Sequence, residues 1–303
     1  FGSWGYGAGP ACVVANVLPN GKVALVEGSV DIGGTRTSIS QQFAEELGIS
    51  ITDILPHVAD TDSIGFTSNT GGSSVTFKSG FAAYQAALDV KKQIIERAAI
   101  TWEASSDEII YRDGGVHHLS KPELSLTFTD VAKDANQTGG PIVGRANVTS
   151  TGAARAYAAM IVDVSVDPET GKTTILRCTA FQDAGKAIHP SYVEGQIQGG
   201  AVQGIGWALN EEYFMSGDGH MVNATLLDYR MPVANDLPMI EPVIVEVPNP
   251  GHPYGVRGVG EAGIVPPLAA VANAVSRAIG VRMMDLPMSP GAVSGKIMSP
   301  AEV

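Results

Sequence analysis

Short apolar runs occur in pairs along the chain, and each pair flanks a segment with the composition of a tight turn. Runs of this length are typical of strands, and a glycine in the turn supplies the positive φ angle that a hairpin requires. Three antiparallel hairpins are therefore predicted: Val13–Val17 with Val23–Val26, Ile109–Tyr111 with Val116–His117, and Met160–Val166 with Thr173–Cys178.

Longer segments carry apolar residues at helical spacing. Residues 82–99 place one apolar stripe along a helix, and residues 38–47 form a helix that would end at Gly48, a left-handed position suited to glycine. Two further helices and a short strand are predicted at Pro190–Leu209, Val265–Ile279 and Val243–Val247. This mixture favours an α+β fold in which mixed sheets pack against helices.

Composition narrows the class of protein. Hydrophobic residues make up 44% of the chain and charged residues 17%, which supports a large core and rules out disorder. The formal net charge of −12 argues against a nucleic-acid surface. No apolar run approaches the roughly 18 residues of a membrane span, so none is expected.

The start of the chain and its cysteines bear on the compartment. Phe1–Trp4 show no basic segment of a signal peptide, and without an initiator Met the chain is expected to be trimmed or part of a longer protein. Cys12 and Cys178 form neither a disulfide framework nor a CxxC metal site, so a reducing cytoplasm is expected. The six histidines show no i, i+4 pair, and no metal held directly by the protein is predicted.

Glycine is in excess, with 36 residues among 303, and it gathers in clusters. Gly171-Lys172-Thr173 resembles the end of a phosphate-binding loop, but two predicted strands flank it, so a hairpin turn is favoured. Gly258–Gly263 reads GxGxxG, with Asp285 further on as a candidate ribose ligand. Because a proline-rich segment separates this motif from the preceding strand, NAD binding remains only the weaker alternative.

Two glycine clusters carry candidate chemistry. The helix around Val193–Trp207 contains five glycines, each costing about 1 kcal/mol relative to alanine, which implies either close helix packing or a bulky ligand. Gly195, Gly199, Gln203 and Gly206 would share one face. Glu261 lies in a glycine-rich turn, where it is either a general base or a residue favoured by the dipole of the following helix.

Five segments appear in a characteristic order, followed by Asp285–Pro290: Gly28–Gly34, Thr70–Thr76, Gln182–Pro190, Val193–Trp207 and Gly258–Glu261. Together they resemble the molybdopterin-binding portion of the xanthine dehydrogenase/aldehyde oxidase family of molybdenum hydroxylases. The resemblance implies the second molybdopterin-binding domain of that fold, with two intertwined subdomains. Residues 1–150 would carry the glycine-rich turns that contact the pterin, and residues 151–303 the glycine-rich helix and the catalytic glutamate turn.

The resemblance also implies roles for individual residues. Glu261 would be the general base beside the molybdenum, in a hydroxylation that takes oxygen from water and passes hydride to the metal. The metal would be held by the pterin dithiolene. Trp4 and Tyr6 lie where the family places aromatic side chains against the substrate, although buried interface positions would explain them equally well. The cofactor-binding residues implied are Gly33, Gly34, Gly71, Gly72, Ser73, Thr76 and Gln203.

The chain departs from the family pattern in three ways. The glutamine of the Gly-Gln-Gly turn is absent at Gly33-Gly34, so its contact must be replaced or lost. Ala262-Gly263 follow Glu261 where two prolines are common. The family's upstream half, with its Gly-Gly-Phe-Gly-Gly motif, is missing, so this chain would hold only half of an active site.

A split enzyme explains the missing half, as in nicotinate dehydrogenase, whose medium molybdopterin subunit this chain resembles; a fragment of a longer chain is the competing explanation. A large molybdopterin subunit would complete the site, and [2Fe–2S] and FAD subunits would carry electrons away. The cofactor would be molybdenum-molybdopterin in its cytosine dinucleotide form, and the substrate an N-heteroaromatic (nicotinate- or purine-like) compound or an aldehyde. The alternatives are an NAD-dependent dehydrogenase using Gly258–Gly263 and a non-catalytic assembly subunit.

Overall fold

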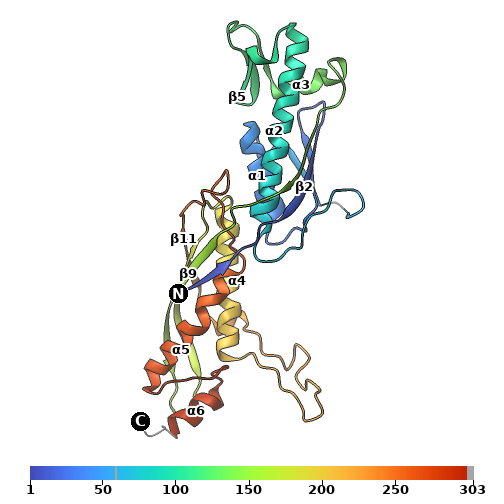
Figure 1. Cartoon of the computed structure of the whole chain (residues 1–303). Coiled ribbons are helices and arrows are strands. Elements are labelled where there is room, and N and C mark those ends of the chain that lie inside the picture. The colour runs from blue at the N-terminus through green and yellow to red at the C-terminus, as the bar shows by residue number, and fades with distance from the viewer. Residues whose placement is uncertain (59, 299–303) are drawn as a thin grey trace. The chain divides into compact units, whose positions relative to one another are not determined.

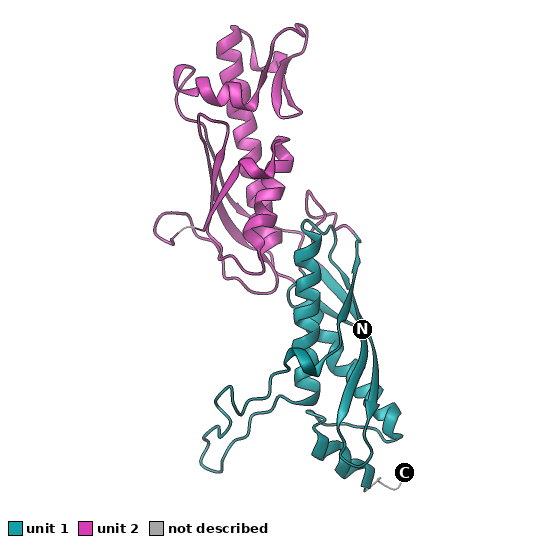
Figure 2. Cartoon of the chain, turned by 180° about the vertical axis from the view of Figure 1, so that it is seen from behind, with its two compact units in different colours: residues 1–5, 155–247, 259–303 teal, residues 6–154, 248–258 magenta. Residues whose placement is uncertain are grey.

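The computed structural model describes residues 1–58 and 60–298 (Figure 1). Two compact units divide the chain (Figure 2). Unit 1 comprises residues 1–5, 155–247 and 259–303, and unit 2 comprises residues 6–154 and 248–258. The chain therefore passes between the units four times. The subdomain division at residue 150 stays a prediction. Relative to it, residues 1–5, 151–154 and 248–258 belong to the other unit.

The main sheet of unit 2 has the strand order β4-β3-β2-β8. Strand β2 is antiparallel to both β3 and β8, whereas β3 and β4 are parallel. The predicted hairpin is thus confirmed, with Gly21 at a φ of 80° in its turn. The strands are β2 (Pro10–Val17), β3 (Val23–Glu27), β4 (Ile54–Val58) and β8 (Val143–Thr149).

Helices α1 (Thr35–Leu47) and α2 (Val75–Trp102) belong to unit 2, and α2 contacts β2 and β8 of its sheet. The expected helix end at Gly48 is confirmed, with a φ of 61°. Alanines fill the buried stripe of α2 and allow close approach, since a Cβ added at Gly144 would lie 2.5 Å from the Ala86 carbonyl oxygen. Helix α2 begins seven residues before the predicted 82–99 segment. The sequence did not indicate these residues, because buried polar side chains interrupt the apolar periodicity of the first turns.

A three-stranded sheet and short helices complete unit 2. The second predicted hairpin is confirmed as an antiparallel pair, and a third strand extends it. Its elements are β5 (Ile109–Arg112), β6 (Gly115–His118), β7 (Ser125–Thr127), α3 (Phe128–Asp134), and the 3-10 helices η1 (Ile51–Asp53), η2 (Ser106–Glu108) and η3 (Ala135–Gln137).

Unit 1 is built on a sheet of order β1-β9-β10-β11, in which only β10 and β11 are parallel. The third predicted hairpin is confirmed, and Gly171 in its turn has a φ of 73°, so Gly171-Lys172-Thr173 is not a phosphate-binding loop. The strands are β1 (Gly2–Gly5), β9 (Arg155–Val166), β10 (Thr173–Asp183) and β11 (Ile240–Val245). The strand expected at 243–247 ends two residues early, where Val245 pairs with Asp183, the last residue of β10.

Helices α4 (Pro190–Leu209) and α5 (Val265–Ile279) match the predicted bounds and pack on this sheet and on each other. Helix α6 (Pro290–Met298) and the 3-10 helices η4 (Ala234–Asp236) and η5 (Ala262–Ile264) complete the unit. A long excursion, residues 211–239, connects α4 to β11 (Figure 1).

One helical segment, Ala262–Ile279, has the length and composition of a membrane span, with a mean hydropathy of 1.3. It contacts β9 and α4 within unit 1, and Val271 and Val275 are fully buried there. Its apolar side chains therefore contribute to the core of the unit.

Candidate functional site

Glu261 lies directly before η5, on a turn that unit 1 holds from two sides. The Gln182 side chain, almost fully buried, donates from Nε2 to the Val259 carbonyl oxygen at 2.6 Å. On the other side, a Cβ added at Gly200 of α4 would lie 3.0 Å from the carbonyl carbon of Gly263. Backbone contact this close requires glycine and fixes the turn against α4.

The Glu261 carboxylate is half-buried and has an aromatic donor. Strand β1 pairs with β9, setting Trp4 opposite Ala156, and the Trp4 indole Nε1 donates to Glu261 Oε2 at 3.1 Å. Trp4 remains 37% exposed. The geometry thus provides an oriented, accessible carboxylate, which is what a general base requires.

Helix α4 uses its glycines in two ways. Gly200 and Gly204 face η5 and α5, and a Cβ at Gly204 would lie 2.6 Å from Pro267 Cβ. Gly195 and Gly199 have nothing within 4 Å of a built Cβ, and Gln203, one turn after Gly199, is exposed. Tight packing therefore accounts for one face of the helix, while the other face is bare.

Gly206 shares the face of Gly195 and Gly199, as predicted, but unlike them it is covered. The following segment folds back over it. A Cβ there would meet the Glu211 side chain and lie 2.7 Å from Pro232 Cδ. The bare face therefore ends before the last turn of α4.

In unit 2, the predicted pterin turn leads into α2. Gly72 and Ser73 both have left-handed backbones, with φ of 62° and 54°. The Ser74 side chain does not cap the helix, because its Oγ donates instead to the Gly71 carbonyl oxygen at 2.8 Å. The backbone at the start of α2 is thus arranged as in helix N-termini that bind anions.

Three distant segments meet behind this turn. A Cβ at Gly258 would contact Tyr6 Cβ and lie 2.9 Å from the Ser73 carbonyl oxygen. The Gly7 N–H donates to the Gly72 carbonyl oxygen at 3.0 Å. Tyr6 itself is 4% exposed, and its hydroxyl accepts a 2.7 Å hydrogen bond from Asn249 Nδ2. Tyr6 therefore buttresses the turn from inside unit 2.

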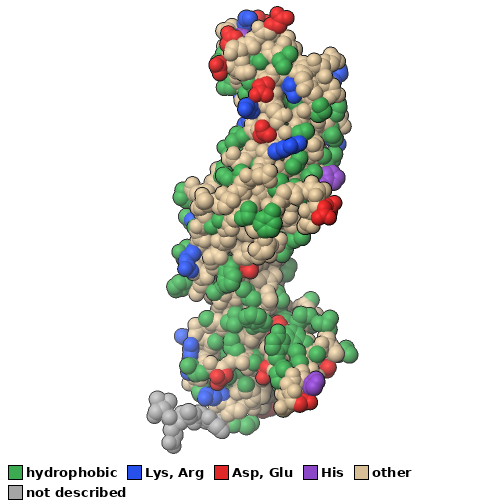
Figure 3. All heavy atoms as spheres, turned by 45° about the vertical axis from the view of Figure 1, so that its right-hand side comes forward, with side chains coloured by type: hydrophobic (Ala, Val, Ile, Leu, Met, Phe, Trp, Pro, Cys, Tyr) green, Lys and Arg blue, Asp and Glu red, His purple; other side chains and the backbone are tan. Residues whose placement is uncertain are grey.

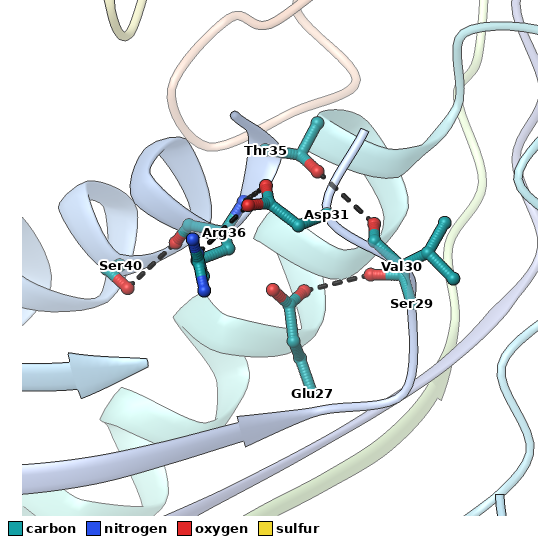
Figure 4. A network of polar contacts seen from close by, with 7 residues as sticks. All are labelled: Glu27, Ser29, Val30, Asp31, Thr35, Arg36 and Ser40. Carbon is teal, nitrogen blue, oxygen red and sulfur yellow. Dashed lines mark hydrogen bonds and ion pairs between the residues drawn. The ribbon is translucent and has the colours of Figure 1, made fainter. Parts of the chain in front are cut away.

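The second predicted turn, Gly33-Gly34, opens α1. Both glycines are left-handed, with φ of 60° and 77°, and Gly34 is the residue before the helix. Arg36 is tied to Asp31 by an ion pair of 2.9 Å and a backbone hydrogen bond of 3.1 Å (Figure 4). Left-handed φ angles at both positions are ones that glycine adopts without strain.

Two buried charged side chains beside these turns escaped sequence analysis. Glu27 is 2% exposed at the end of β3, and burial raises its pKa to about 7. Ser29 Oγ donates to Glu27 Oε2 at 2.8 Å (Figure 4). It also lies 3.2 Å from Ser79 Oγ. Lys78 is 1% exposed in the first turns of α2. The only sequence signal was a charged residue inside an apolar run next to a glycine-rich turn.

The predicted site residues are distributed over both units. Trp4, Gln203 and Glu261 belong to unit 1. Tyr6 and the remaining predicted cofactor residues belong to unit 2: Gly33, Gly34, Gly71, Gly72, Ser73 and Thr76. The Trp4 indole donates directly to Glu261, and Tyr6 and Ser73 both pack against Gly258.

The structure also bears on the alternative sites. Residues 258–263 are not a dinucleotide fingerprint, because β11 ends at Val245 and the short η5 intervenes before α5 begins at Val265. Residues 1–58 and 60–298 contain no group of three His, Cys, Asp or Glu side chains placed to hold a metal ion. His252 is buried against the Phe77 carbonyl oxygen, and burial lowers its pKa to about 4.

The α+β scaffold thus places glycine-rich, left-handed turns directly before α1 and α2. A family model described as the molybdopterin cofactor-binding domain matches residues 2–238. The chain therefore belongs to the family of molybdopterin cofactor-binding domains.

Three known proteins illustrate the similarity. The chain is 34% identical to the putative xanthine dehydrogenase molybdenum-binding subunit XdhA of Escherichia coli K12, over 91% of this chain and 38% of that protein. The crystal structure of quinoline 2-oxidoreductase from Pseudomonas putida 86 matches with a TM-score of 0.85 and 28% identity, over 96% of this chain and 38% of that one. The Cu,Mo-CO dehydrogenase matches in fold, with a TM-score of 0.88 and 24% identity, over 99% and 41%. The chain thus spans about two fifths of these relatives.

The residues present fit such a cofactor. In unit 2, a left-handed turn leads into the N-terminus of α2, whose first backbone N–H groups are donors suited to phosphate. In unit 1, the bare face of α4 presents glycines that no other described residue covers, with the exposed Gln203 beside them.

Proposed function

We propose that this chain is the molybdopterin-binding part of a molybdenum hydroxylase, with Glu261 as its general base. The observation that carries the proposal is the oriented carboxylate of Glu261, held by Trp4 on a turn locked by Gln182 and α4. Membership of the molybdopterin cofactor-binding domain family supports it.

The proposed reaction is R–H + H2O → R–OH + 2 H+ + 2 e−. The molybdenum cofactor, in its cytosine dinucleotide form, supplies the two-electron redox chemistry when bound. Glu261 accepts one of the two protons, and the Trp4 indole fixes the plane of the carboxylate through Oε2. Gln203 would donate a hydrogen bond to the pterin. The other residues that would hold the cofactor are Gly33, Gly34, Gly71, Gly72, Ser73 and Thr76.

The proposed substrate is an N-heteroaromatic compound or an aldehyde. The names of two relatives, a putative xanthine dehydrogenase subunit and a quinoline oxidoreductase, favour the heteroaromatic class. Trp4 is exposed enough to stack on such a ring, whereas Tyr6 would act by shaping the turn at Gly258.

The proposed complex also contains a large molybdopterin subunit, a [2Fe–2S] subunit and a FAD subunit, and it lies in the cytoplasm.

Large apolar side chains are exposed along the 211–239 excursion, and hydrophobic groups gather on the face of unit 1 in the lower part of Figure 3. An apolar surface of this kind is typical of a protein interface. The exposed residues are Tyr213, Phe214, Met215, Val222, Leu226, Leu227, Met231, Val233 and Met239.

Metal analysis of the purified complex tests the proposal. Molybdenum and pterin should co-purify with the chain, and Glu261→Gln should keep both while losing nearly all turnover. Glu194→Gln, which changes an exposed glutamate on α4, is the matched control and should leave turnover unchanged. A complex without molybdenum would overturn the proposal in favour of the assembly-subunit alternative. Full turnover by Glu261→Gln would remove Glu261 from the mechanism.

A further inference from the structure

Lys78 is a buried cation whose ammonium group binds one short segment of chain. It lies in the first turns of α2 and is 1% exposed. Its Nζ donates three hydrogen bonds: to the Ser68 carbonyl oxygen at 2.8 Å, to Ser68 Oγ at 2.8 Å and to the Asn69 carbonyl oxygen at 2.6 Å. An ammonium has three protons, and each has an acceptor here.

No carboxylate neutralises this charge. Among the described residues, the ion pairs involve other lysines and arginines, and all three acceptors of Lys78 are uncharged. Burial lowers the pKa of Lys78. A buried, unpaired ammonium is costly, so its three short hydrogen bonds must hold the segment firmly if they are to offset that cost.

The segment that Lys78 binds leads directly into the predicted pterin turn. Ser68 is also anchored to β2, since its N–H donates to the Pro10 carbonyl oxygen at 3.0 Å. The Gly71 N–H donates to the Asn69 carbonyl oxygen at 3.1 Å, so this oxygen accepts hydrogen bonds from both Lys78 and the start of the turn. Beyond it, Ser73 has a φ of 54°, a strained conformation for a non-glycine residue that persists only when its surroundings impose it.

We propose that Lys78 is a positioning residue: its ammonium fixes the backbone of Ser68 and Asn69 and thereby holds the left-handed Gly72-Ser73 turn in the conformation that binds an anionic ligand. The identity of that ligand, the phosphate of the molybdopterin cofactor, rests on the proposed function. The role of Lys78 in holding the turn is independent of the proposed function. The uncompensated positive charge beside the turn further favours an anion there.

Amide hydrogen exchange in the full chain without cofactor tests the hold on the turn. In Lys78→Met, peptides covering residues 66–74 should exchange roughly tenfold faster or more, because charge-assisted hydrogen bonds are lost. Peptides covering β5, β6 and β7 should be unchanged. Lys92→Met, at an exposed lysine on the same helix, is the matched control and should leave both regions as they are.

Ser68→Ala provides a second variant. It removes one acceptor of Lys78 and the 3.3 Å hydrogen bond from Ser68 Oγ to the Pro10 carbonyl oxygen, and it keeps both carbonyl contacts of Lys78. It should accelerate exchange in the same peptides by a smaller factor. Unchanged exchange at 66–74 in both variants, or equal acceleration throughout unit 2, would overturn the positioning role.

Molybdenum content separates this inference from the proposed function. In the purified complex, Lys78→Met should lose most of its molybdenum, whereas Glu261→Gln should retain it. Full molybdenum in Lys78→Met would refute the link between the turn and the ligand. A wild-type complex without molybdenum would refute the proposed function, and the exchange measurement would still decide the role of Lys78.

Discussion

The indole of Trp4 donates to the carboxylate of Glu261 at 3.1 Å, across 257 positions of sequence. Strand β1 makes this contact possible by adding the first residues of the chain to the edge of the β9 strand. Both residues belong to unit 1, so this part of the proposed site is assembled within one compact unit.

Trp4→Phe should lower kcat roughly tenfold and change KM less. Phenylalanine keeps the apolar ring and loses only the N–H donor, so the carboxylate loses its orientation without losing its neighbour. Steady-state kinetics of the purified complex would measure the effect. Trp207→Phe, at an exposed tryptophan on α4, is the control. An equal loss in both variants, or none in Trp4→Phe, would contradict an orienting role.

Glu27→Gln should change how stability depends on pH. The folded-state pKa of Glu27 is raised from 4.5 to about 7. Between these values the folded chain keeps a proton that the unfolded chain releases, so stability falls as pH rises. The contribution approaches about 3 kcal/mol above pH 7. Gln cannot ionise, so the stability of the variant relative to wild type should increase from pH 5 to pH 8.

Thermal unfolding at the two pH values would measure this difference. Glu96→Gln, at an exposed glutamate of α2, should show the same difference from wild type at pH 5 and pH 8. Parallel pH profiles for Glu27→Gln and wild type would show that Glu27 ionises normally in the folded chain.

Replacing glycine by alanine should have opposite effects on stability at the two faces of α4. Gly199→Ala places a Cβ in open space and should stabilise the chain by about 1 kcal/mol through helix propensity. Gly204→Ala places a Cβ 2.6 Å from Pro267 Cβ and should destabilise it by about 1–3 kcal/mol. Denaturant unfolding of both variants would measure the pair.

Gly199→Ala has a second consequence under the proposed function. If the cofactor lies on the bare face, this variant should bind less molybdenum while being more stable, a combination that general damage to the fold cannot produce. Unchanged molybdenum content would place the cofactor elsewhere.

Gly34→Gln should destabilise the chain by about 1–2 kcal/mol. The backbone at position 34 has a φ of 77°, which disfavours a residue with a Cβ. Gly34→Asn should cost less, because asparagine tolerates this region better. Thermal unfolding would compare the three chains, and equal stability would show that the turn relaxes to accept a side chain.

Local signals predicted most of the elements. The hairpins around Gly21, Gly114 and Gly171 and the end of α1 at Gly48 follow from residues close in sequence, whose periods and turn preferences act over a few positions. The sequence did not predict the first turns of α2, because the polar residues Lys78 and Ser79 are buried there, whereas polar residues usually lie on the surface.

The sequence by itself determined the α+β class, seven of the eleven strands and four of the six α-helices of the described residues, the glycine-rich turns, and the glutamate that the family resemblance singled out. Only the tertiary structure decided which glycines of α4 pack and which are bare, that Trp4 reaches Glu261, and that Glu27 and Lys78 are buried. The physical reason is that periodicity reports the conformation of one segment. Close approach, burial and hydrogen bonding depend on segments far apart in the chain, which only the folded structure brings into contact.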